Sequence, residues 1–137
     1  MRVLLEPAGL EQLEREQDEH VLDRLAHFFD DYSHPMPTEG YLEYFARDRA
    51  FHNLIVSCSR NGRIMKTYAV MQNHIDRGRN FLMTTAPGRA DETLDEHQAV
   101  ATALGKRDFD LTRAELIRHL KTGEQLMIEA VRVRRRT

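Results

Sequence analysis

A carboxylate and an imidazole lie four residues apart in the segment "ARDRAFHNLI" (residues 46–55). In a helix, positions i and i+4 lie side by side on one face, so Asp48 and His52 would be neighbours. Both residues fall on a stripe that is otherwise apolar and recurs at three- and four-residue intervals: Tyr41, Tyr44, Phe45, Phe51 and Ile55. Burying either polar group is costly unless it is paired, hydrogen-bonded or bound to a metal ion.

Two further histidines fall on apolar faces of other segments. His97 follows Leu94 by three residues, and His119 follows Leu116 by three. Imidazole and carboxylate ligands together suit zinc, nickel, iron or manganese. A divalent ion bound by one carboxylate and neutral imidazoles would leave a charge of about +1, which attracts an anionic ligand. The candidate metal ligands are therefore Asp48, His52, His97 and His119.

The spacing alone leaves a second interpretation open, in which each histidine is a core residue satisfied by ordinary hydrogen bonds. Other sites find less support. His20, His27 and His34 recur every seven residues and would share a face of one helix, but about 10.5 Å apart, too far to share an ion. The sequence contains no HExxH motif and no Glu three residues before a His, as zincins or di-iron bundles require. Cys58 follows apolar residues and is expected to be packed, with nothing nearby to lower its pKa.

The composition describes one globular domain with its own core: 137 residues, 41% hydrophobic and 31% charged. No apolar run is long enough for a membrane span, and the single cysteine fits a reducing cytoplasm. The net charge of −2 gives no overall reason to bind nucleic acid. Four of the last six residues are Arg, which is typical of a solvated helix end.

Hydrophobic periodicity predicts an all-α fold, an antiparallel bundle of about six helices. "SHPMPTEG" (33–40), "SRNGR" (59–63) and "TTAPGRADE" (84–92) read as the connecting loops. "TRAE" (112–115) has the form of a capping box near the start of the last helix. The expected helices cover residues 2–15, 19–32, 38–58, 64–81, about 94–104 and about 110–131.

Four stretches match, in order, the motifs of one known family. They are "RVLLEP", "DRAFHNLIVSCSRNGRI", "PGRADETLDEHQAVATALGKRD" and "LTRAELIRHLKTG". Together they resemble the C-terminal ligand-sensing domain of GntR-type transcriptional regulators, the all-helical FCD domain of the FadR subgroup. The resemblance covers nearly the whole chain, and its specificity comes from the order and spacing of the four stretches.

The resemblance implies that Asp48, His52, His97 and His119 hold a divalent metal ion, with zinc or nickel favoured. It also implies a central cavity beside the metal, in which a small carboxylate-bearing effector binds. Arg2 aligns with a first-helix arginine that can face this cavity, although a surface position near the chain end is an equal alternative. Further candidates for the cavity lining are Asn73, His74 and Arg77.

Full-length relatives place a winged-helix DNA-binding domain before the sensor domain, and residues 1–137 begin inside what resembles the first sensor helix. The resemblance therefore implies a homodimeric, cytoplasmic sensor that reaches DNA only through a fused domain absent from this chain. The sequence predicts ligand sensing without chemistry on the ligand.

Two other functions stay open. A metal-dependent helical hydrolase would need a general base, and Glu96, next to His97, points about 100° away on the helix. A purely structural dimerisation module would bind no metal.

Overall fold

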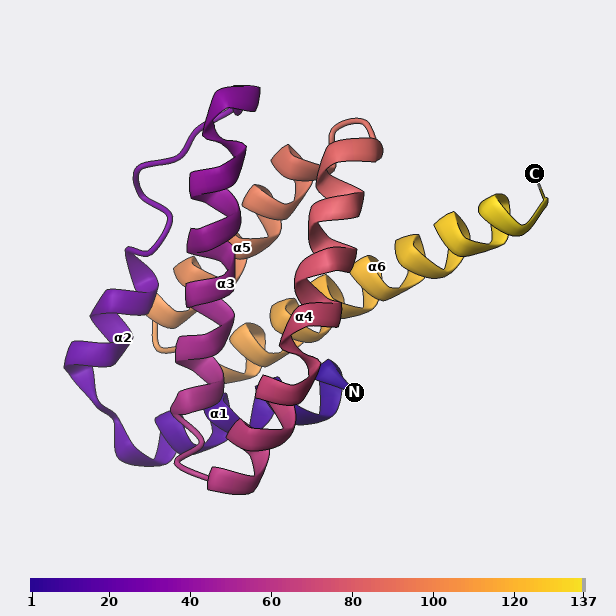
Figure 1. Cartoon of the computed structure of the whole chain (residues 1–137). Helices are drawn as coiled ribbons and strands as arrows, with labels where there is room; N and C mark the ends of the chain where they lie inside the picture. Colours follow the sequence, from indigo (N-terminus) through magenta and orange to yellow (C-terminus); the bar gives the residue numbers. More distant parts are fainter. Residues whose placement is uncertain (137) are drawn as a thin grey trace.

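Six α-helices and one 3-10 turn make up the computed structural model, which describes residues 1–136 (Figure 1). No strand occurs in this range, so the all-α prediction is confirmed. Nor does any helix of the described part combine the length and apolar character needed to cross a membrane. The helices are α1 (Arg2–Glu16), α2 (Glu19–Ala26), α3 (Tyr41–Ser57), α4 (Gly62–Thr85), α5 (Arg89–Gly105) and α6 (Phe109–Arg136), with the 3-10 turn η1 at Thr38–Gly40.

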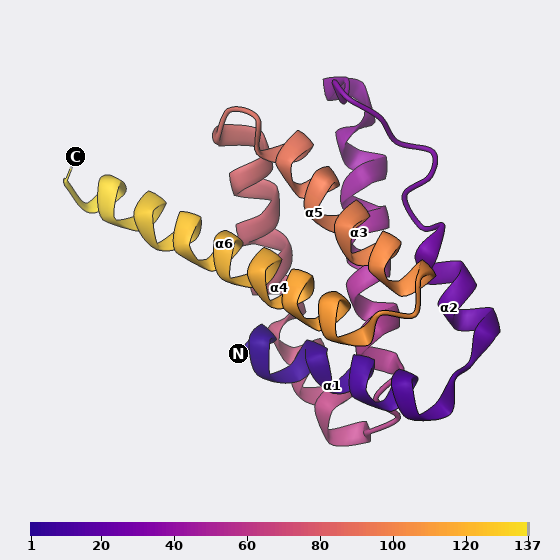
Figure 2. The same ribbon diagram turned by 180° about the vertical axis from the view of Figure 1, so that it is seen from behind.

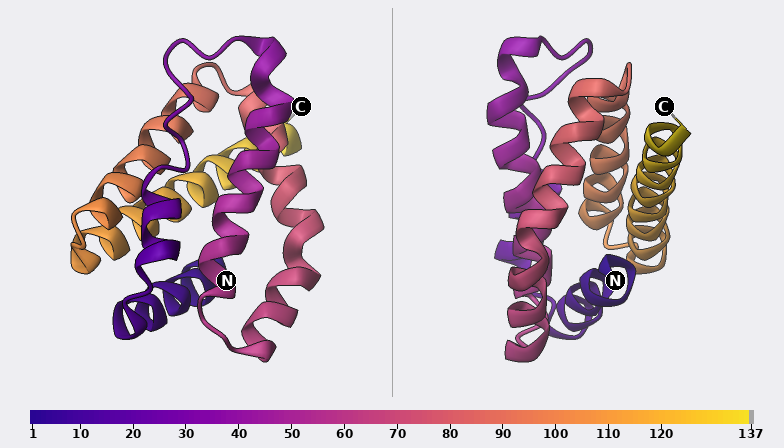
Figure 3. Two further views of the ribbon diagram at one scale, coloured as in Figure 1. Left: turned by 90° about the vertical axis from the view of Figure 1, so that its left-hand side faces the viewer. Right: turned by 45° about the vertical axis from the view of Figure 1, so that its right-hand side comes forward.

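The helices form a bundle in which α3 and α4 run antiparallel and α5 lies on their far side (Figures 1 and 2). The contact between α5 and α6 is extensive, and the right-hand view of Figure 3 shows these helices side by side. Helix α1 crosses one end of the bundle and packs against both α3 and α6. The last turns of α6 extend beyond the other helices (Figures 1 and 2).

The second helix is shorter than predicted, because α2 ends at Ala26 and turns follow as far as Asp31. These turns still bury the rings of Phe28 and Phe29. The apolar pattern that predicted a longer helix therefore marks buried residues, although their backbone is not helical. The predicted shared helix face of His20, His27 and His34 is therefore wrong. His34 lies in the following loop, where its ring contacts two carboxylates at the start of α5, those of Asp91 and Asp95.

Helix α3 is also shorter than predicted, because residues 38–40 form the 3-10 turn and the helix ends at Ser57, whereas the remaining helices are longer than predicted at one end or both. Helix α4 starts at Gly62, because the Asn61 side chain accepts hydrogen bonds from the next backbone N–H groups, and continues to Thr85. Helix α5 starts at Arg89, inside the predicted loop. The expected capping box at residues 112–115 does not start α6. Instead, the Asp108 carboxylate accepts from the N–H of Leu111, 3.1 Å away.

Aromatic rings fill the core between α2, α3 and α5. Phe29 contacts Phe51 edge to face, with ring centroids 4.9 Å apart, and Tyr44 lies beside Phe29. Where α1 crosses α3, no side chain separates the two backbones. A Cβ atom added to Gly9 would lie 1.8 Å from the carbonyl oxygen of Ile55. This close approach brings the first turns of α1 against the middle of α3, where His52 lies.

The Gly9 contact predicts a large effect from a single methyl group. Gly9→Ala should lower the free energy of unfolding by about 3 kcal/mol, because α1 must move away from α3 to admit the Cβ atom. Chemical denaturation measures this change. Gly62→Ala is the control, since a Cβ there meets nothing within 4 Å and should leave stability equal or slightly higher. Equal stability of Gly9→Ala and the parent chain would contradict the close approach.

Candidate metal centre

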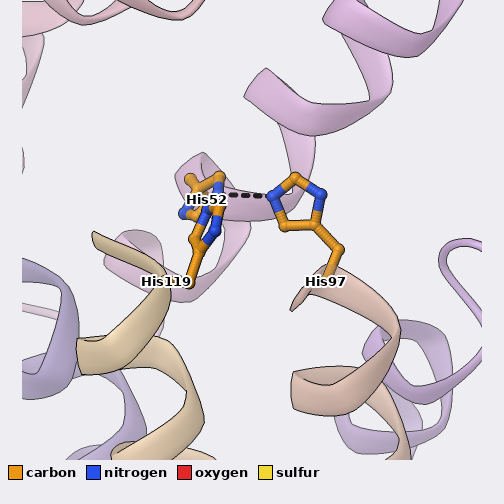
Figure 4. Close-up of side chains that lie close together, drawn as sticks. All are labelled: His52, His97 and His119. Carbon is orange, nitrogen blue, oxygen red and sulfur yellow. Dashed lines mark hydrogen bonds between the residues drawn. The ribbon is translucent and has the colours of Figure 1, made fainter. Parts of the chain in front are cut away.

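Three buried imidazoles from three helices converge inside the bundle. His52 comes from α3, His97 from α5 and His119 from α6 (Figure 4). The Nε2 atom of His52 lies 3.1 Å from that of His97 and 3.3 Å from that of His119. One nitrogen from each ring lies within 4.8 Å of the other two, a spacing that could hold a single metal ion.

Asp48 approaches the same point from one turn earlier on α3. Its Oδ1 atom lies 3.2 Å from Nε2 of His52 and 3.3 Å from Nε2 of His97. Asp48 is buried, and Oδ1 has no hydrogen-bond partner among the described residues. The other oxygen, Oδ2, lies 3.2 Å from Nε of Arg79. The structure thus brings the four predicted side chains together, with the three imidazoles as the compact set and Asp48 against two of them.

The outer nitrogen of each imidazole has its own hydrogen-bond acceptor. Nδ1 of His52 lies 2.5 Å from Glu6, and Nδ1 of His119 lies 2.5 Å from Glu96. Because an ionised carboxylate can only accept, both Nδ1 atoms must carry the hydrogen. A neutral ring with its hydrogen on Nδ1 directs the lone pair of Nε2 toward the centre, as in histidines that bind metals.

Tyr44 fixes the tautomer of His97 through a chain of hydrogen bonds. The Thr93 hydroxyl donates to the carbonyl oxygen of Ala90, 2.7 Å away, and accepts from the Tyr44 hydroxyl at 2.9 Å. The Tyr44 oxygen is then free to accept from Nδ1 of His97, 2.7 Å away. Burial raises the pKa of Tyr44, so its hydroxyl keeps the hydrogen. The ring of Phe29 stacks on His97 at 4.7 Å and fixes its plane.

The centre therefore collects electron pairs without hydrogens between them. Burial lowers the pKa of His97 and lowers that of His119 to about 3, which keeps both rings neutral. Although burial acts to raise the pKa of Asp48, the Arg79 guanidinium holds it well below its usual range. Each of the neutral rings of His97 and His119 uses its one hydrogen on Nδ1, so its Nε2 atom carries none. The dashed line in Figure 4 marks how closely the Nε2 atom of His52 approaches that of His97. A divalent cation resolves the repulsion among these acceptors, so the residues fit a metal ion.

Comparison with known families agrees with this geometry. The sequence profile of the FCD domain matches residues 1–122. The chain belongs to the FCD domain family. FCD domains are the C-terminal effector domains of GntR regulators. No curated protein and no solved structure matches the chain significantly.

Three arginines lie around the histidines of this FCD domain without contacting them directly. Each pairs with a carboxylate that in turn contacts a histidine of the centre. Arg2 lies 2.7 Å from Glu6, and Nη1 and Nη2 of Arg89 lie 2.8 and 3.1 Å from the two oxygens of Glu96. Arg79 pairs with Asp48 in the same way. Sequence reasoning missed Glu6, Arg79 and Arg89. It considered Tyr44 only as part of an apolar stripe and Glu96 only as a poorly placed general base.

A cavity of about 280 Å³ opens beside the centre, between α1, α4, α5 and α6. Of the residues predicted to line it, Arg2 and His74 do so, whereas Asn73 and Arg77 are exposed and lie outside the lining. Arg79 lines it instead. The Nη2 atoms of Arg2 and Arg79 are buried and have no hydrogen-bond partner in the described part of the chain. The cavity therefore offers two unused guanidinium donors close to the histidines.

The neutral histidines predict that the FCD domain without metal loses stability in acid. Below the ordinary histidine pKa of 6.5, the unfolded chain takes up a proton that folded His119, with its pKa of about 3, does not. The free energy of unfolding in chelator should therefore be about 2 kcal/mol lower at pH 5 than at pH 7. Urea denaturation at the two pH values measures this difference in the free energy of unfolding.

His119→Asn is the matched variant for this prediction, because its amide can still donate to Glu96 while the titrating ring is lost. It should show a smaller decrease between pH 7 and pH 5. Unchanged or greater stability of the parent domain at pH 5 would contradict neutral burial of the rings.

Proposed function

We propose that this FCD domain is a metal-dependent sensor of carboxylate effectors within a GntR regulator. A divalent ion, zinc or nickel, would be held by His52, His97, His119 and Asp48. The observation that carries the proposal is the convergence of three buried Nε2 atoms, with the Nδ1 atoms of their rings already hydrogen-bonded elsewhere, on the unpartnered Oδ1 atom of Asp48. An ordinary buried histidine cluster would place hydrogens between these atoms.

The charges around the centre favour an anionic ligand. The positive charges of Arg2, Arg79 and Arg89 are balanced by the negative charges of their partners Glu6, Asp48 and Glu96. A bound divalent ion supplies an uncompensated charge and a Lewis-acidic position that a carboxylate oxygen can occupy. Arg2 and Arg79 then contribute the two free Nη2 donors, which would bind the same or a second oxygen of the ligand.

Sensing is favoured over hydrolysis because the two glutamates that contact the histidines are already engaged. Glu6 accepts from Arg2, His52 and Tyr68, and Glu96 accepts from Arg89 and His119. Glu96 therefore orients a histidine and is poorly placed to act as a general base. FCD domains are regulatory sensor domains and generally non-catalytic.

In a whole regulator, we propose that this domain forms a cytoplasmic homodimer and reaches DNA only through a fused winged-helix domain. Effector binding would favour one arrangement of the dimer. The resulting shift can be no larger than the difference in effector affinity between the two arrangements.

Metal analysis tests the proposal directly. The purified domain should contain about one equivalent of zinc or nickel per chain, and His97→Asn/His119→Asn should lose it, since two of the three converging nitrogens are gone. Mass spectrometry of the elements measures both. The control is His20→Asn/His27→Asn, which changes two exposed histidines and should keep the metal. Equal metal content in both double variants would overturn the assignment.

Carboxylate binding tests the role of the arginines. Acetate should raise the melting temperature of the metal-loaded domain and not that of the chelated domain. Arg79→Gln should weaken acetate about tenfold, the effect of losing one charged hydrogen bond, while one equivalent of metal remains. Arg77→Gln is the matched control, since Arg77 lies two residues away and outside the cavity. Equal effects of the two substitutions would remove Arg79 from the binding site.

A further inference from the structure

The polar residues that line the cavity beside the histidines fall into two groups. The polar side chains that are withdrawn from solvent, Arg2, Asp48, Arg79, Arg89, Thr93 and His119, all belong to the hydrogen-bonded groups around the three imidazoles. Two other polar residues of the lining, His74 and Glu124, are exposed and border the opening. Between these two regions the lining is apolar.

The apolar region is formed mainly by facing stripes of α4 and α6. On α4, Met71, Ile75 and Leu82 recur at helical spacing, and Leu120 and Met127 do so on α6. The two helices are in contact and cross close to α1 (Figures 1 and 2). The apolar lining is completed by Met1, Val3 and Met83. Methionine side chains adapt to ligands of varied shape, so this wall suits a flexible apolar group.

Gly78 leaves room between the two stripes. It lies between Ile75 and Leu82 on the cavity side of α4, and a Cβ atom there would be 3.8 Å from the sulfur of Met127. Any larger side chain at this position would enter the apolar part of the cavity. The absence of a side chain at Gly78 therefore leaves space between the two stripes that a ligand can fill.

We propose that the effector is a monocarboxylate with a short apolar tail. This inference rests on the proposed function and adds the class of ligand. The cavity of about 280 Å³ is close to the lower end of the range for small-molecule sites, which favours a short tail. The carboxylate occupies the polar end, and the tail lies along the apolar lining. A hydroxylated or doubly charged ligand of equal length would bury polar groups against Met71, Ile75 and Leu82 without partners.

Calorimetry with straight-chain acids of increasing length tests the proposal on the metal-loaded domain. Affinity should rise about fourfold per methylene from butanoate to hexanoate, in proportion to the apolar surface buried, and level off near octanoate. Adipate and gluconate, which have six carbons and polar far ends, should bind at least about tenfold more weakly than hexanoate. Binding of adipate or gluconate as tight as that of hexanoate would overturn the proposal.

Gly78→Leu locates the tail. In this variant, hexanoate should bind no more tightly than butanoate, while acetate keeps its affinity within about twofold because the polar end is unchanged. Gly62→Leu is the matched control, at a glycine of the same helix with open space around it, and should keep the full chain-length dependence. A chain-length dependence that survives in Gly78→Leu would overturn the position of the tail.

The outcomes separate this inference from the function on which it rests. Metal-dependent binding of acetate with no gain from longer chains would overturn the apolar tail and leave carboxylate sensing intact. If no acid binds the metal-loaded domain more tightly than the chelated one, both proposals are overturned.

Discussion

Three hydrogen bonds on the outer nitrogens of the histidines determine what the inner nitrogens can do. Glu6, Tyr44 and Glu96 each accept a hydrogen from one Nδ1 atom, which leaves every Nε2 atom as an electron-pair donor. Neutral imidazoles in an apolar interior would otherwise share hydrogens with one another and form an ordinary polar cluster. The residues that distinguish a metal centre from such a cluster are therefore not the ligands themselves but the acceptors behind them.

The arginines in turn stabilise the negative charge of the carboxylates that contact the histidines. Each acceptor carboxylate, and Asp48 as well, pairs with a guanidinium. Burial acts to raise the pKa of Glu6, but His52 and the Arg2 guanidinium together hold it well below its usual range. A charged shell of this kind is costly to bury and is tolerated because its members are paired. Of these pairs only Arg79–Asp48 joins two helices, α4 and α3, and the contacts of the histidines link α1, α3, α5 and α6 to the same centre.

Much of the helical fold could be predicted from periodicity, and the errors have physical causes. The apolar pattern of Phe28 and Phe29 suggested helix, but turns bury these rings equally well. At the site, the stripes placed the four predicted side chains on inward faces, but spacing within a helix says nothing about which residues of other helices they meet. Glu96 shows this clearly: it does point away from His97 along α5, and in doing so it reaches His119 on α6.

Helix phase alone could have identified Arg79, and not Arg77, as the arginine of α4 that lines the cavity. Ile75 and Leu82 lie seven residues apart on one stripe, and Arg79 follows Ile75 by four, whereas Arg77 lies on another face. Arg89 and Tyr44 gave no comparable signal. Their roles depend on the tertiary arrangement of α3, α5 and α6, which local sequence does not encode.

The direct backbone contact between α1 and α3 at Gly9 limits how far these two helices can move relative to each other. Helices separated by side chains accommodate displacement through rotamer changes, but two backbones in contact cannot. The crossing therefore fixes the separation of α1 and α3, and it places Glu6, three residues before Gly9, within hydrogen-bond distance of His52. Helix α4, which carries Gly78 and Arg79, packs less extensively than α6 on the opposite side of the cavity. The two sides of the ligand cavity thus differ in how firmly the rest of the bundle holds them.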